Sequence, residues 1–310
     1  MPDVATLLLV SFAVGIVVGL TGMGGGALMT PALIFFGVPP SAAVANDLVA
    51  AAANKSVGAA VHWRNGSPNF HLAKWLIIGS VPTAFLGAFI VDAVGASADQ
   101  EAFMKAAIGV ALLFAAVTYV ARIYVSSRQP AEPGDDFDIR PVLTLLLGAF
   151  GGLMVGTTSV GSGSVIMVIL LLLYPRLAPR ALVGTDLVQA IPLVMSAAIS
   201  HVIVTGIDWA VLIPLIVGGS PGTFLGARLA SVISPVVIRR GIVLVLLVTG
   251  LAMLDVPKVV VAVVGATALC GCVAAGVRRG SGVGPPSNHF CHPSTRIGRP
   301  PWSAGRDRSR

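Results

Sequence analysis

The chain has 310 residues and a net charge of +7, and 55% of its residues are apolar whereas only 11% are charged. Too few polar side chains are available to cover a water-soluble globule, so this composition excludes an ordinary soluble protein and indicates an integral membrane protein. The lipid bilayer is its first expected partner. Much of the positive charge lies in an arginine-rich stretch from residue 278 onward, which gives little reason to expect nucleic acid as a partner.

Apolar runs follow one another along almost the whole sequence. The long runs suit α-helices that cross a hydrocarbon core, which takes about 20 residues, whereas runs of about 12 residues are too short to cross it alone. The sequence therefore predicts an all-α fold with both spanning and shorter helices. In chain order the runs are 4–20, 26–37, 42–62, 72–94, 102–125, 141–156, 164–174, 181–203, 209–233, 241–254 and 257–277.

The second half of the sequence repeats the first. A tandem duplication within a membrane protein is typical of secondary transporters, whose substrate site lies between the halves near the middle of the bilayer. The matched segments are Gly19-x-Thr21 with Gly156-x-Thr158, Gly24-x-Gly26 with Gly161-x-Gly163, Asp47-Leu48-Val49 with Asp186-Leu187-Val188, His62 with His201, and Pro82-x-x-Phe85-Leu86-Gly87-Ala88 with Pro221-x-x-Phe224-Leu225-Gly226-Ala227.

The repeat and the polar segments divide the chain into five parts. We expect a first membrane repeat over 1–125, a linker over 126–140 and a second repeat over 141–255. An additional transmembrane helix over 256–277 and a disordered basic tail over 278–310 follow, because the tail is rich in proline, serine and arginine and has hardly an apolar residue.

Lysine and arginine predict the orientation of these parts in a bacterial inner membrane. If the N-terminus lies outside, 17 of the 20 basic residues fall on the cytoplasmic side, as the positive-inside rule requires. The linker and the C-terminal tail are then cytoplasmic. Each half contains an odd number of further crossings after its first two runs, so the two repeats are expected to be inverted, with about seven full crossings and two hairpins.

Glycines interrupt the helical pattern at the start of each half, first in the stretch Gly19–Leu33. They fit neither a dinucleotide fingerprint nor a phosphate-binding loop, since no strand precedes them and no Gly-Lys-Ser/Thr follows, and no cofactor or metal is expected. They predict instead a break at membrane depth, followed by half-helices that begin near Ala27 and Ser164. Such a break is tolerated where protein buries it or where it lines a cavity.

A half-helix start presents free N–H groups and the positive end of the helix dipole, so two such starts are expected to bind an anion together. The candidate substrate-binding residues supply these amides or add hydroxyl donors. Close packing of helices through small residues is the alternative explanation for the glycines. The candidates are Thr21, Gly24, Gly25, Gly26, Thr158, Ser159, Gly161, Ser162, Gly163 and Ser164.

Polar residues stand in the apolar helix that follows each break: Asn46 and Asp47 in one half, and Thr185, Asp186 and Gln189 in the other. Such groups are expensive in a membrane, so by default they face the protein interior and mark a pathway. Two roles remain open for them. They either hold the broken backbone by hydrogen bonds or take up protons.

Lys55 has no counterpart in the second half, where Val194 occupies the matching position. An unduplicated cation within the membrane suggests a contact with the substrate, and a salt bridge to Asp47 or Asp186 is the alternative. A serine hydrolase that uses Ser162 with His201 is a further hypothesis. It is weakened because the two residues do not share the symmetry of the repeat.

These residues resemble the TauE/SafE sulfite exporter family of membrane transporters, also called the toluene sulfonate uptake permease family. The resemblance rests on GLTGMGGGALMTPAL with the later ANDLV, on GTTSVGSGSVIMVIL with GTDLV, and on the paired Pro-x-x-Phe-Leu-Gly-Ala segments, and it covers residues 4 to about 255. It implies a bacterial inner-membrane transporter, not an enzyme, that exports sulfite, sulfonates or other sulfur-containing anions with proton coupling. A channel for the same anions is the alternative, and the sequence does not indicate an oligomeric state.

Overall fold

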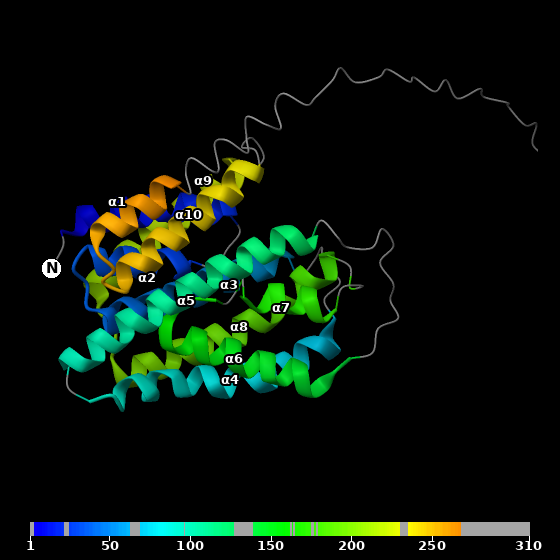
Figure 1. Cartoon of the computed structure of the whole chain (residues 1–310). Helices are drawn as coiled ribbons and strands as arrows, with labels where there is room; N and C mark the ends of the chain where they lie inside the picture. Colours follow the sequence, from blue (N-terminus) through cyan, green and yellow to red (C-terminus); the bar gives the residue numbers. More distant parts are fainter. Residues whose placement is uncertain are drawn as a thin grey trace, which may run out of the picture. The chain divides into compact units, whose positions relative to one another are not determined.

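The computed structural model describes residues 3–21, 25–62, 69–95, 97–126, 139–161, 163, 165–174, 177, 179–229 and 235–267. Within these residues every regular element is a helix (Figure 1), which confirms the predicted all-α fold. The helices are α1 (Val4–Thr21), α2 (Gly26–Phe35), α3 (Pro40–His62), α4 (Phe70–Asp92), α5 (Ser97–Ser126), α6 (Pro141–Thr158), α7 (Val165–Leu173), α8 (Pro179–Val204), α9 (Trp209–Leu229) and α10 (Pro235–Met253).

Five of the described helical segments are long and apolar enough to cross a membrane, namely 70–92, 98–121, 141–158, 184–204 and 209–229. A shorter apolar helix, Lys258–Thr267, follows α10 at the start of the predicted additional crossing. The linker residues 127–138 and the tail lie outside the described residues, and the proposed boundaries between the five parts stay predictions.

The helical pattern is interrupted where the glycines predicted it. α1 ends at Thr21 and α2 begins at Gly26, while α6 ends at Thr158 and α7 begins at Val165. In the second interruption Ser159 and Gly161 have φ values of 61° and 112°, in the left-handed region that no helix continues through. Because α2 has 10 residues and α7 has 9, neither is long enough to span a bilayer alone.

The two halves pack by exchanging helices. α1 of the first half lies against α9 of the second, and α4 of the first half lies against α6 of the second, as Figure 1 shows for the cyan and green helices. α3 and α8 contact each other, as do α5 and α10. Since α1 corresponds to α6 and α4 to α9 in the repeat, the same contacts recur when the halves are interchanged.

Glycines at four-residue spacing make these exchanged contacts close. In α6, Gly148, Gly152 and Gly156 lie on one face, and a Cβ on each would overlap the backbone of α4. In α9, Gly218, Gly222 and Gly226 lie in the same way against the backbone of α1. Close packing, proposed above as the alternative to a binding role, therefore accounts for Gly156. Gly87, which matches Gly226 in the repeat, makes an equally close contact with the backbone of Gly156.

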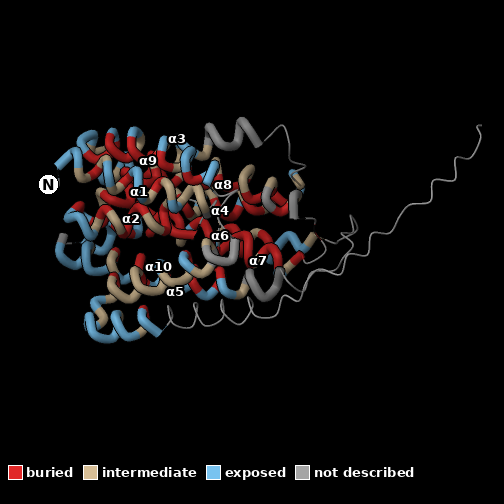
Figure 2. Tube along the Cα trace, turned by 90° about the horizontal axis from the view of Figure 1, so that it is seen from above, coloured by how far each residue is buried: buried red, intermediate tan, exposed pale blue. Residues whose placement is uncertain are grey.

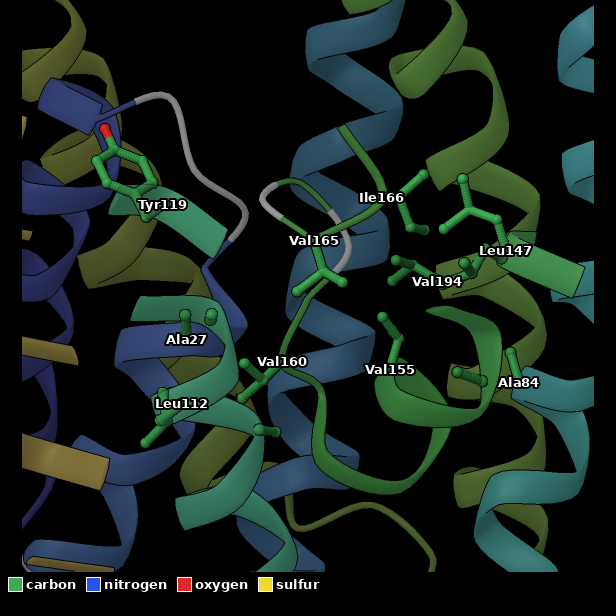
Figure 3. Packing of buried hydrophobic residues seen from close by; sticks show 14 of the residues in the cluster. Ala27, Ala84, Leu112, Tyr119, Leu147, Val155, Val160, Val165, Ile166 and Val194 are labelled. Atoms are coloured by element: carbon green, nitrogen blue, oxygen red, sulfur yellow. The ribbon is translucent and has the colours of Figure 1, made fainter. Parts of the chain in front are cut away.

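An apolar core surrounds the second interruption. Val160, Val165 and Ile166 are 0% exposed and pack with Ala27 and Leu112 in one cluster (Figure 3). Figure 2 shows buried residues along α4, α6 and α8. Buried residues on either side of the interruption therefore help to hold this backbone, and burial by protein is a condition for irregular structure at membrane depth.

Substitution of one of the packed glycines tests the exchanged contact between α1 and α9. In Gly222→Ala the new Cβ overlaps the carbonyl oxygen of Phe12, so we expect the free energy of unfolding to fall by about 1–3 kcal/mol. Gly241 in α10 has open space around it, and Gly241→Ala should stabilise the protein by about 0.5–1 kcal/mol through helix propensity. Equilibrium unfolding in mixed detergent measures both, and equal effects would contradict the described packing.

Candidate functional site

The start of α2 and the interruption between α6 and α7 meet inside the protein. A Cβ on Gly26 would overlap the carbonyl oxygen of Ser159, so only glycine allows this approach. Both residues were candidates for the anion site, and the structure brings them together although they lie in different halves. In this arrangement the first residue of α2 packs directly on backbone from the other half.

Asp47 joins the two interrupted segments. One carboxylate oxygen, Oδ2, accepts a hydrogen bond from the Thr30 hydroxyl of α2 at 2.7 Å and another from the Ser159 hydroxyl at 2.7 Å. The side chain is only 2% exposed. We call the three residues Thr30, Asp47 and Ser159 the Asp47 bridge. Because Ser159 belongs to the second half, the bridge connects the halves as well as the segments.

The carboxylate of Asp47 also lies near the start of α2. Its second oxygen, Oδ1, is 3.8 Å from the position that a Cβ on Gly25 would take, and Gly25 is the N-cap residue of α2. A negative group is stabilised at this end of a helix by the unpaired amides and the dipole. The protein's own carboxylate thus lies beside the helix start that the sequence predicted for a substrate anion.

Lys55 lies in the same charged group. It interacts electrostatically with Asp186 of α8 and, more weakly, with Asp47 of its own helix α3. The side chain is half-buried. The unduplicated lysine and the two duplicated carboxylates therefore form one electrostatic cluster where α3 packs against α8. This arrangement favours the interaction with Asp47 or Asp186 that was the alternative for Lys55.

The remaining polar residues of the two helices hold backbone and neighbouring helices. The Thr185 hydroxyl donates to the Ala181 carbonyl at 2.7 Å and accepts from the Asn69 amide, which precedes α4, at 3.0 Å. The Gln189 side-chain amide donates to the Ser80 hydroxyl of α4 at 3.0 Å. These bonds fasten α8 to α4, so they support a structural role for Thr185 and Gln189.

Asn46 is fully buried, and its side-chain amide donates to the Ala42 carbonyl at 2.8 Å. Its oxygen, and likewise the Gln189 oxygen, has no hydrogen-bond partner among the described residues. Both oxygens are acceptors, so an anion could bind only the second N–H of either side-chain amide. The role of Asn46 stays a prediction.

The second interruption is also stabilised from within its own half. The Thr158 hydroxyl donates to the Met154 carbonyl at 2.6 Å and accepts from the Val160 amide at 3.2 Å. Gly161 is buried and Gly163 half-buried. Gly24, Ser162 and Ser164 lie outside the described residues, as does the side chain of Thr21, so the anion-binding role proposed for them stays a prediction.

His201 is 1% exposed, and its Nε2 lies 2.6 Å from the Gly156 carbonyl oxygen in the last turn of α6. This contact ties α8 to the helix end that precedes the interruption. This hydrogen bond occupies Nε2, the nitrogen that a serine hydrolase would use as its base.

Sequence reasoning missed Thr30. It is fully buried, and its hydroxyl is the only one in the ten residues of α2, GALMTPALIF. A single hydroxyl in such an apolar half-helix was a usable signal, because a buried polar group needs a partner. The partner could not be read from the sequence, since Asp47 lies 17 positions away.

A groove of about 410 Å³ opens between α5 and α6 beside this site. Its lining is almost wholly apolar and includes Phe103, Val110, Phe114 and Phe150, each at least partly exposed. It reaches Thr158, the last residue of α6 before the interruption. The groove therefore lies on the surface of the protein, next to the site.

The family model for the sulfite exporter TauE/SafE matches residues 7–253. The chain belongs to this family. The match spans both halves, from within α1 to the end of α10, so the repeat and the two interruptions lie within the family region. The protein is a multi-pass membrane transporter of the TauE/SafE family, as the sequence resemblance predicted.

Two relatives from Bacillus subtilis (strain 168) agree with this assignment. The probable membrane transporter protein YjnA is 35% identical over 252 residues, which cover 80% of this chain and 99% of the relative. The probable membrane transporter protein YdhB is 26% identical over 251 residues, with the same shares. No solved structure matches the chain.

The Asp47 bridge predicts a measurable contribution to stability. Thr30→Val keeps the shape of the side chain but leaves a buried carboxylate short of one donor, so the free energy of unfolding should fall by about 1–3 kcal/mol. Thr118→Val is the matched control, because the buried Thr118 hydroxyl donates only one turn back, to the Ala115 carbonyl of its own helix. Unfolding in mixed detergent that shows the same loss for both variants would contradict the bridge.

Proposed function

We propose that the protein is a secondary transporter in the bacterial inner membrane that exports small sulfur-containing anions, such as sulfite or organosulfonates, with proton coupling. The observation that carries the proposal is the meeting of two interrupted helices, one from each half, at a buried cluster of hydroxyls and charges. Such groups are costly inside an apolar helical protein, so by default they mark the path of a substrate or ion. Membership of the TauE/SafE family supports the substrate class.

The substrate anion would lie at the half-helix starts near Gly24 to Ala27 and Gly161 to Ser164. Amides at these starts and the Ser159 hydroxyl are donors suited to sulfur oxyanions. Lys55 would supply a positive charge to this site, because it lies within electrostatic range of Asp47, whose carboxylate accepts a hydrogen bond from Ser159. In the described conformation Asp47 occupies the Ser159 hydroxyl, so the anion must compete with this carboxylate for it.

Transport would follow from movement of the halves around this site, with the repeats inverted and with the N-terminus outside and the C-terminus in the cytoplasm. Because α1 packs on α9 and α6 packs on α4 in the same way, the contacts between the halves are pseudo-symmetric. This supports a movement of the halves that can open the site toward either side of the membrane. The direct contact between Gly26 and Ser159 supports alternating access over a permanently open channel, because the two interrupted segments touch there in the described conformation.

Substitution of Lys55 tests the site. We expect Lys55→Ala to lower kcat/KM for saturable sulfonate uptake into proteoliposomes by about tenfold or more, because a hydrogen bond to a charged group contributes about 1.5–3 kcal/mol. The matched control is Lys74→Ala, since Lys74 is exposed near the start of α4. Uptake by Lys55→Ala at the rate of the control would remove Lys55 from the site.

A further inference from the structure

The Asp47 bridge is the part of the site that must open if the halves move apart. Thr30 and Asp47 belong to the first half, whereas Ser159 follows Asp47 by 112 positions and belongs to the second. Any movement that separates α2 from the second interruption has to break the bond between Asp47 and Ser159. The strength of this bond therefore bears directly on how easily the halves separate.

The bridge does not obey the symmetry of the repeat. Asp186 matches Asp47, but Met167 stands at the position that matches Thr30, and Gly22 stands at the position that matches Ser159. Neither of these two residues has a hydroxyl, so Asp186 cannot form an equivalent bridge. A carboxylate that only supported interrupted backbone would be needed alike in both halves, and the asymmetry indicates a separate task for Asp47.

The charges around Asp47 oppose the binding of a further negative charge. Lys55 and Asp186 interact electrostatically there, and the residues of α2 and α7 are uncharged. α5 and α9, which also contact α3, carry their charged residues toward their ends. Two carboxylates and one ammonium leave one net negative charge, so a substrate anion adds repulsion in a medium that screens it poorly.

We propose that Asp47 takes up one proton from water when the substrate anion binds, and that this protonation opens the Asp47 bridge. The proposal rests on the transporter function above. The proton forms an O–H bond on the carboxylate, and the cluster with its bound anion then keeps its former net charge. Charge-assisted hydrogen bonds are roughly twice as strong as neutral ones, so the neutral acid holds Ser159 less firmly. The Ser159 hydroxyl can then donate to the anion.

Anion and proton then cross the membrane in the same direction. With a monovalent anion the pair carries no net charge, so only the pH gradient and the anion gradient set the direction of flux. Export occurs when the outward concentration gradient of the anion is larger than the inward proton gradient that opposes it. An acidic compartment should therefore drive the anion toward the alkaline one.

Uptake of radiolabelled methanesulfonate into proteoliposomes containing the full chain tests this coupling. A sulfonate stays ionised at every pH of the assay, so any proton that moves with it is bound by the protein. With an interior more alkaline by about one pH unit, one proton per anion predicts about tenfold accumulation by the wild type. Asp47→Asn should exchange the anion but bring it only to equal concentrations on both sides, and tenfold accumulation by this variant would overturn the proposal.

Ser159→Ala separates the bridge from the proton site. It removes one donor to Asp47 and leaves Asp47 able to titrate. Because Ser159 is also proposed to bind the anion, the absolute rate should change, so the readout is the ratio of the exchange rate at about pH 8 to that at about pH 6, which should rise toward one. Ser200→Ala is the matched control, because the buried Ser200 hydroxyl donates to Ala197 within its own helix. A ratio for Ser159→Ala equal to that of the control would show that the bridge does not limit opening.

Hydrogen exchange without substrate tests the bridge independently of transport. Protonation of Asp47 is linked to opening of the bridge also before an anion binds, so a lower pH should favour the open bridge. After correction for intrinsic rates, amides of 25–33 in the wild type should exchange roughly threefold faster or more at about pH 6 than at about pH 8, and those of Asp47→Asn should exchange equally fast at both. Equal pH dependence of hydrogen exchange in both proteins would refute the bridge even if transport is found.

The expected pattern of hydrogen exchange without any methanesulfonate flux would refute the proposed substrate class and leave the bridge supported. If Asp47→Asn does not fold, Ser159→Ala takes its place, with a smaller pH dependence expected than in the wild type.

Discussion

The hydrogen bonds of Asp47 hold together the two places where the helical structure is interrupted. At 2.7 Å each, the bonds from Thr30 and Ser159 satisfy a carboxylate that is almost fully buried in an apolar protein. A buried carboxylate without such donors would be strongly destabilising. These two bonds therefore tie α2 to the second half at the candidate site.

Glycine faces place the halves so that these bonds can form. Gly148, Gly152 and Gly156 of α6 let its backbone lie on that of α4, and the corresponding face of α9 does the same with α1. Helices in lipid gain little from the hydrophobic effect when they associate, so close backbone packing is a main source of their attraction. Each half therefore packs closely against one helix of the other half. This packing allows Gly26 to lie directly against the backbone of Ser159.

Much of the fold could be predicted from the sequence because it depends on local and periodic signals. Apolar runs and repeated glycines predicted the helices and both interruptions, with the starts of α2 and α7 within one residue of the expected Ala27 and Ser164. The partners of individual side chains could not be predicted. The bond from Ser159 to Asp47 joins positions 112 apart, and nothing in the spacing of either residue specifies it.

The central claim is that the interrupted helices of both halves bind one anion between them. An X-ray structure of the protein with selenite, the heavier analogue of sulfite, tests this most directly, because anomalous scattering locates selenium without reference to the protein. The account predicts a selenium peak between the start of α2 at Gly26 and the interruption at Ser159, with the bond from Ser159 to Asp47 broken. A peak elsewhere, or selenite bound while that bond stays intact, would contradict it.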